Sequence, residues 1–326
     1  MLECSFNFFE TSDFLHYTSH FLTIITMPID IFGFYLIYFK IHPSMKNMRE
    51  VLVYSHMCLI GDISIGTLTI PYVYIPSMSG TALGWLDDFG ISYFVMFYFL
   101  CIIIIELAAS AVLMFENRHY QAVRSAWKIE TKVQRFIFIF LNCFTPFIIL
   151  LPIWVDIPDQ TDNELLQISK CIPSDFYELP NIIITNDPHT AGFICFVLLF
   201  FYTIQCIFFV THTIYSLYFS SFSKTLSSRT KKMQRKYLIS VIIQISSLFL
   251  SFALPFIYFV FSIIYEYYNQ AFNNFCFIFM SIYGCISTLT TILTYDHFRT
   301  VCFKMMQFKE TTSMFVQQNS VMNTVV

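Results

Sequence analysis

The chain has 326 residues, of which 56% are hydrophobic and 19% aromatic, while only 12% are charged. Soluble domains carry about 25% charged residues, which is about twice the share found here. A soluble protein with so few charged side chains could not cover 40 Phe and 20 Tyr with a polar surface. With 18 Lys and Arg against 21 Asp and Glu, the composition also excludes a nucleic-acid-binding protein and a disordered chain. The composition therefore predicts an integral membrane protein.

Long runs without Asp, Glu, Lys or Arg mark the predicted membrane spans. Four such runs lie from residue 136 onward. Three earlier runs each contain one acid, and about ten large apolar residues outweigh the insertion cost of that acid. Only helices fit, because the strands of a membrane barrel alternate over about 10 residues. The seven predicted spans cover residues 18–39, 51–74, 91–115, 136–155, 191–219, 237–264 and 273–295, between an extracellular tail 1–17 and a cytosolic tail 296–326.

The basic residues alternate between the two sides of these spans. Seventeen of the 18 Lys and Arg fall in the first, third and fifth connections and in the C-terminal tail. Segments rich in Lys and Arg stay in the cytosol, and an even number of spans would break the alternation. The sequence therefore predicts an all-α, seven-transmembrane helix bundle with its N-terminus outside and its C-terminus in the cytosol.

Three acids, Asp30, Asp62 and Glu106, fall near the middle of their predicted spans. The spans contain no Lys or Arg to neutralise them, and acids inside a membrane are candidates for functional sites. They either bind a cation such as Na⁺ or stay protonated, or they are single buried acids bonded to hydroxyl groups of neighbouring helices. Both interpretations remain open at this point.

The cytosolic end of the third span contains Glu116 and Arg118. An acid can hold such an Arg until a partner takes it, although an Arg there also simply reaches toward the headgroups. A basic run leads directly into the sixth span and includes Lys231, Lys232 and Arg235. This run is either a docking surface or an anchor to anionic lipid headgroups.

Two further features concern the last two spans. Pro255 lies in an otherwise uniform apolar run, where a proline bends the helix and either lets its inner end swing or gives a static kink. After the seventh span, residues 299–310 place apolar and basic side chains on different faces, which is typical of a helix lying on the membrane surface.

Motifs of enzymes and of metal or cofactor sites are missing from the sequence. It contains no P-loop, GxSxG, HExxH or GxGxxG motif, and its 10 Cys and 8 His form no cluster at metal-ligand spacing. The sequence therefore predicts neither an enzyme nor a bound cofactor or metal.

From about Phe21 to Arg299, the chain resembles the nematode serpentine chemoreceptors of class H (Srh). The residues that carry the resemblance are Met27 to Tyr35, Phe39-Lys40, Pro43 to Lys46, Ile70-Pro71-Tyr72, Pro76, Gly80, Gly84, Phe115 to Arg118, Ile157 to Gln160, Gln234-Arg235-Lys236, Asn273-Asn274, Gly284 and Ser287-Thr288.

This resemblance implies a G-protein-coupled receptor for odorants or other small chemicals in the membranes of sensory neurons. It also implies that Glu116 and Arg118 are counterparts of the acid–Arg switch of rhodopsin-like receptors. The chain departs from the family at 295–299, where Tyr-Asp-His-Phe-Arg replaces a stretch similar to His-Lys-Pro-Tyr-Arg. The NPxxY motif of rhodopsin-like receptors is also missing from the sequence.

The fourth connection, residues 156–190, is long and carries seven acids. It is either a lid over an outward-facing pocket or a solvated spacer. This connection contains Cys171. In rhodopsin-like receptors the cysteine of the corresponding loop forms a disulfide with a cysteine at the top of the third span, but residues 75–100 of this chain contain no Cys. Cys4 and Cys276 are the alternative partners, on the oxidising side of the membrane.

The predicted mechanism is a two-state equilibrium of the helix bundle, shifted by an odorant-like ligand that enters from outside between spans three, five, six and seven. The predicted partners are this ligand, a heterotrimeric G protein and the lipid bilayer, and the predicted location is the plasma membrane of sensory-neuron cilia. The alternative function is a cation-coupled transporter or ligand-gated channel that uses the acids within the membrane.

Overall fold

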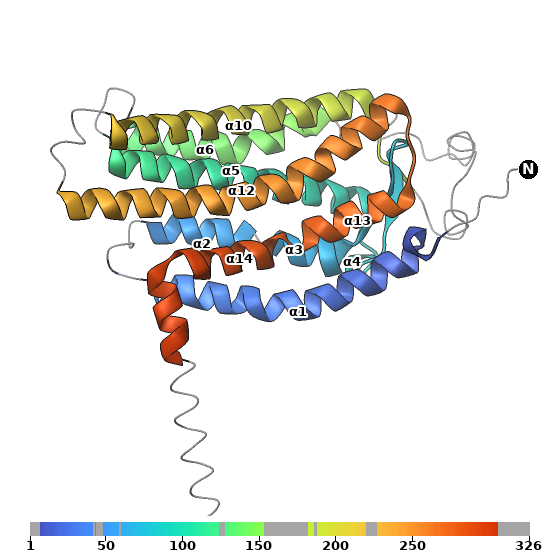
Figure 1. Ribbon diagram of the computed structural model, residues 1–326. Helices are drawn as coiled ribbons and strands as arrows, with labels where there is room; N and C mark the ends of the chain where they lie inside the picture. The colour runs from blue at the N-terminus through green and yellow to red at the C-terminus, as the bar shows by residue number, and fades with distance from the viewer. Residues whose placement is uncertain are drawn as a thin grey trace, which may run out of the picture.

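A computed structural model of the chain describes residues 7–41, 43, 48–58, 60–123, 128–152, 182–185, 188–219 and 227–305. Over these ranges the protein is a bundle of long helices that run alongside one another (Figure 1). The long helices are α1 (Ser12–Phe39), α5 (Tyr93–Ala122), α6 (Lys132–Ile149), α10 (Pro188–Tyr218) and α12 (Ser228–Tyr265), followed by the pair α13 (Gln270–Ser281) and α14 (Tyr283–Thr294).

Polar caps, rather than the limits of the apolar runs, set where these helices begin. The side chain of Thr11 accepts from the backbone N–H of Phe14 at 3.2 Å, and Thr131 forms a capping box with Gln134 at the start of α6. Ser227 caps α12 in the same way. Several helices are therefore longer than the predicted spans. A charge-free run marks only the part of a helix in the hydrocarbon region, whereas the helix itself continues through charged residues beyond it.

The second predicted span, 51–74, is wrong at its outer end. Its helical part consists of α2 (Arg49–Cys58), α3 (Ile60–Ile63) and a π-helical turn, Ser64–Thr69. Ile70, with φ of 37°, ends the helix, and Pro71 has no N–H to continue it. Residues 71–74 are a strand instead of the last turn of a helix.

A small antiparallel sheet caps this end of the bundle. Strand β1 (Pro71–Tyr74) pairs with β2 (Ser79–Ala82), with Pro71 opposite Ala82, and β2 pairs with β3 (Ile182–Ile183). The short helix α4 (Trp85–Asp88) follows β2. A Cβ atom at Gly84 would collide with the backbone of Leu68 and Thr69, so glycine is needed where this connection returns to the helix end.

Six helices in the described ranges are long and apolar enough to cross a membrane, namely α1, α5, α6, α10, α12 and the α13–α14 pair. The interrupted α2–α3 segment is the remaining pass. Large apolar side chains on the outer faces are exposed, including Phe136, Phe140 and Phe144 along α6, as expected where lipid is the solvent. The predicted all-α, seven-transmembrane bundle is thus confirmed, while the side on which each terminus lies stays a prediction.

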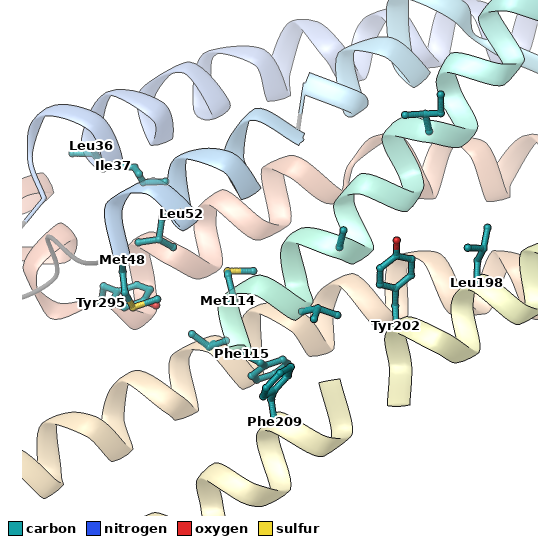
Figure 2. Close-up of a cluster of buried hydrophobic side chains, with 14 of the residues drawn as sticks. Leu36, Ile37, Met48, Leu52, Met114, Phe115, Leu198, Tyr202, Phe209 and Tyr295 are labelled. Atoms are coloured by element: carbon teal, nitrogen blue, oxygen red, sulfur yellow. The ribbon is translucent and has the colours of Figure 1, made fainter. Parts of the chain in front are cut away.

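Helix α5 forms the centre of the bundle. It packs against α2, α6, α10 and α12, and its side chains Met114 and Phe115 belong to the largest buried cluster. Figure 2 shows Phe115 close to Phe209 of α10, and Tyr295, the residue after α14, near Met48. This cluster joins α1 and α2 to α10 and α12. It lies next to residues 116–119 of α5, which are all polar.

Helix α12 continues through Pro255 and bends along its length (Figure 1). A proline inside a helix removes one backbone hydrogen bond and bends the axis. Pro255 lies inside α12, and a kink at this residue stays a prediction. Residues 296–305 form a further helix that turns away from α14 (Figure 1). Part of the predicted surface helix, 306–310, lies outside the described residues.

Candidate functional site

Four consecutive polar side chains are buried near the end of α5. Glu116, Asn117, Arg118 and His119 are each no more than 2% exposed. A buried charge is costly unless it is paired or hydrogen-bonded. The partners of Glu116 and Arg118 therefore show what this end of the bundle is built to hold.

Glu116 is paired with Arg135 of α6. Its Oε2 atom accepts from Nη2 of Arg135 at 3.0 Å and from Nε at 3.2 Å. The same Nη2 atom also donates to Oδ1 of Asn117 at 2.9 Å. The expectation that Glu116 holds Arg118 is contradicted, because side chains two positions apart on a helix point to different sides.

Arg118 lies against aromatic rings rather than an acid. Its Cζ atom is 4.8 Å from the ring centroid of Tyr237 in α12, and Tyr295 is close enough to interact electrostatically with it. Its Nε and Nη2 atoms have no hydrogen-bond partner among the described residues. Arg118 is therefore a buried cation stabilised by cation–π contact.

The basic run at the start of α12 lines a cleft of about 660 Å³ with Tyr218 of α10 and Thr294 of α14. The predicted coupling residues Lys231, Lys232 and Arg235 all lie on this cleft. Arg235 stacks on the ring of Tyr218, 3.8 Å from Cζ to the ring centroid. These three residues are thus brought together, but Arg118 is absent from the lining.

Asp296 joins α12 to the chain that follows α14. It forms ion pairs with Lys236 and, at 2.8 Å, with Arg299. The hydrogen bond from Lys236 is the main cause that lowers the pKa of the Asp296 carboxyl. Desolvation opposes it, and the charges of Lys236 and Arg299 lower the pKa further. The acid that distinguishes this chain from the usual family pattern at 295–299 is therefore used in an exposed ion-pair network.

An apolar cavity of about 580 Å³ lies between α5, α10 and α12. Ile207, Phe249 and Leu250 line it and are each more than half exposed, so the cavity opens between α10 and α12 on the outer face of the bundle. The hydroxyl groups of Tyr202, Thr203 and Ser246 are the polar features of a lining that is otherwise made of apolar side chains and Cys206. Such a cavity has the size and character of a pocket for a small apolar molecule.

The two described acids within the predicted spans, Asp30 and Glu106, do not meet at one site. Oδ1 of Asp30 accepts from the Thr288 hydroxyl at 2.8 Å, where α1 meets α14. Glu106 accepts a hydrogen bond from Tyr54 of α2, whose hydroxyl also lies 3.3 Å from Sγ of Cys143 in α6. Both acids are thus bonded to hydroxyl groups of neighbouring helices, which was the second of the two interpretations.

Several predicted residues lie beyond what the structure describes. The backbone of Asp62 is in α3, but its side chain is outside the described set, and Cys4 and Cys171 lie outside the described residues. Cys276 is among the described cysteines that carry no disulfide. Within the described ranges, no group of three or more His, Cys, Asp and Glu side chains is arranged to hold a metal ion.

The opposite end of the bundle is held by buried amide groups at the start of α13. Nδ2 of Asn273 donates to the carbonyl oxygens of Val73 at 3.3 Å and Ile75 at 3.5 Å. Asn274 donates to the carbonyl oxygen of Phe9 at 2.9 Å, and Gln270 to that of Val73 at 3.3 Å. Sequence reasoning missed this role, although amides at i, i+3 and i+4 on one helix face were a usable signal.

A comparison with known protein families decides the class of this bundle. Residues 10–308 match the family described as serpentine type 7TM GPCR chemoreceptor Srh. The chain belongs to this family. It is also 22% identical over 242 residues to serpentine receptor class H-72 of Caenorhabditis elegans, which covers 73% of this chain and 70% of that protein.

Membership of the Srh family fixes the general activity of the protein. It is a multi-pass membrane protein and a serpentine chemoreceptor of the G-protein-coupled type, which in general implies a small-molecule ligand and a G protein. The Srh family is a receptor family and not an enzyme family. The resemblance predicted from the sequence is therefore confirmed.

Proposed function

We propose that this Srh receptor detects a small apolar chemical in the cavity between α5, α10 and α12 and passes the signal to a heterotrimeric G protein through Arg118. One observation carries the proposal. Phe115 lines the cavity and directly precedes Glu116 in α5, so a ligand that moves Phe115 also moves the helix turn that holds Glu116 and Arg118.

The proposed entry route differs from the one expected from the sequence. We expected entry from outside between spans three, five, six and seven, but no residue of α13 or α14 lines the cavity among the described residues. Its exposed rim on α10 and α12 supports entry from the lipid instead. A volatile or lipid-soluble molecule concentrates in the bilayer before it binds, which favours ligands of that chemistry.

Signalling is proposed to be a shift between two states of the bundle. In the resting state, Glu116 is held by Arg135, and Arg118 is held against Tyr237. In the signalling state α5 and α12 are further apart. A ligand that binds this state more tightly than the resting state stabilises it by the difference between the two binding free energies. Pro255 lies inside α12, and a kink there gives the basic end of α12 a point about which it swings. Arg118 then donates to the G protein.

The cellular setting is part of the proposal. The alternating basic connections support a cytosolic C-terminus, and the chemoreceptor family supports a place in the plasma membrane of sensory-neuron cilia. In the transporter or channel alternative, the membrane acids act together. The separate hydroxyl partners of Asp30 and Glu106 do not favour that alternative.

Expression in a reporter sensory neuron, with a panel of volatile compounds, tests the proposal. Ala253 is buried and lines the cavity, whereas its neighbour Leu254 is 55% exposed and does not. We expect Ala253→Phe to abolish the response to any active compound while Leu254→Phe preserves it. Equal responses of these two variants would refute the cavity assignment.

Two further measurements separate the remaining alternatives. Arg118→Ala is expected to abolish output while the receptor still reaches the cell surface. Ligand-evoked current or uptake that persists in cells without G proteins would favour a channel or transporter instead.

A further inference from the structure

We infer that the basic cleft at the start of α12 binds the phosphorylated headgroup of a lipid in the leaflet where the basic connections lie. This inference concerns a site separate from the proposed ligand cavity and does not rest on it. The cleft has a volume of about 660 Å³, and four cationic side chains of α12 line it.

The cleft faces away from the interior of the bundle. Tyr237 contacts Arg118 and so marks the interior face of α12. Arg235 and Ile239 lie two positions before and after Tyr237, which is about 160° around a helix in either direction. A G protein that takes Arg118 approaches the interior face, whereas the cleft is presented to the surrounding lipid.

The lining changes in character along the helix in the way that a lipid molecule requires. Ser228, Lys231 and Lys232 come first, Arg235 lies one turn further on, and the exposed Ile239 and Ile243 follow. Cations therefore stand where headgroups lie, and apolar side chains stand where acyl chains begin. A free phosphate gains nothing from the two isoleucines, so this order favours a lipid over a free phosphate.

The charge of the cleft is not neutralised by its surroundings. Among the described residues no acid lines it, and the sequence contains no Asp or Glu from Pro188 through Tyr265. Asp296 is paired with Lys236, which lines the cleft. Lys231, Lys232 and Arg235 therefore remain for an anion with more than one negative charge.

Arg235 is oriented to receive that anion. The ring of Tyr218 fixes the plane of its guanidinium group at 3.8 Å, which lowers the entropy lost on binding. Its Nε atom is shielded from solvent and has no hydrogen-bond partner among the described residues. A guanidinium group held in this way presents two parallel donors to phosphate oxygens.

Lipid retention by the purified full chain tests this inference. Native mass spectrometry would compare binding of phosphatidylinositol bisphosphate and phosphatidylcholine to the wild type and to the variant K231Q/K232Q/R235Q. The matched control, K40Q/R229Q/K304Q, removes three basic residues that do not line the cleft. We expect the cleft variant to lose the bisphosphate lipid by at least about tenfold, and the control variant by less than about twofold.

Several outcomes would overturn the inference. Equal losses in both variants would show that only overall surface charge matters, and equal binding of soluble inositol trisphosphate would show a site for free phosphate. Unchanged lipid binding with lost G-protein coupling would show a protein-docking surface. If the triple variant fails to fold, R235K keeps the charge without the planar fork and is expected to weaken lipid binding. Undiminished binding by R235K would also contradict the site.

Discussion

The two ends of the bundle are held together by different chemistry. At the end that carries the sheet, neutral amides of Asn273, Asn274 and Gln270 donate to backbone carbonyl groups. At the basic end, Glu116 is paired with Arg135, and Arg118 stacks on Tyr237.

This difference suggests which end is able to move. Loss of one of these amides leaves a buried backbone carbonyl short of a donor, which costs free energy, so we expect the amide end to be fixed. Charged side chains exchange one partner for another, and Arg118 already has two unpaired donors. The basic end is therefore the end at which a change of state costs least.

The largest expected effect comes from removing the unpaired cation. Arg118→Leu should abolish all ligand-evoked output, while the melting temperature of the purified receptor stays the same or rises, because a buried charge without a hydrogen-bonding acid is removed. A reporter assay and a thermal melt on the same variant measure the two effects. A melting temperature that falls by many degrees would show that Arg118 mainly stabilises the fold.

Asn273→Leu should act in the opposite way at the fixed end. The substitution leaves the carbonyl oxygen of Ile75 without its donor and should lower the free energy of unfolding by about 1–3 kcal/mol. Thermal melts and surface expression would be compared with those of Gln234→Leu, a change of the same kind at a partly exposed position of α12. Equal stability of the two variants would contradict a structural role for the amide network.

Glu116→Gln should raise signalling in the absence of ligand. Arg135 is 28% exposed and turns to water once its acid is gone, so the resting state loses stability relative to the signalling state. A rise of at least about fivefold is expected from a coupling energy of ordinary size. Glu130→Gln, at an exposed acid of the same connection, is the control and should leave the baseline unchanged. A silent Glu116→Gln receptor would argue against a resting role for the Glu116–Arg135 pair.

The smallest effect should come from the exposed pair of Lys236 and Asp296. The pKa of Asp296 is lowered by its cations, so its contribution to stability is present at neutral pH and is lost as the pH falls below about 4. Because the pair faces solvent, Asp296→Asn should cost less than about 1 kcal/mol and the cost should vanish in high salt. Melts at two ionic strengths check this, and a large, salt-independent loss would indicate a different role for Asp296.

Much of the fold followed from single-residue patterns. Charge-free runs located the helices. The end of the second span was missed because Pro71 to Tyr74 are as apolar as a span, and only their pairing with β2 makes them a strand. Helices α1 and α12 begin at Ser12 and Ser228, before the predicted spans, because caps rather than hydrophobicity decide where a helix begins.

The candidate site was predictable only in part. Glu116 and Arg118 were recognisable from their position at the end of the third span. Arg135 and Tyr237, their actual partners, were not, because they come from other helices and the rotation of each helix about its axis selects them. The cavity was likewise hidden, since apolar residues that line a void have the same composition as residues that fill a core.

The sequence by itself determined that lipid is the solvent, how many times the chain crosses it, and which connections carry the basic charge, because hydrophobicity and charge are properties of single residues summed along a run. Tertiary structure alone decided that Arg135 takes Glu116, that Arg118 is left against Tyr237, and that a cavity opens between α10 and α12. These are relations between side chains of different helices, and they depend on how the helices rotate and pack against one another.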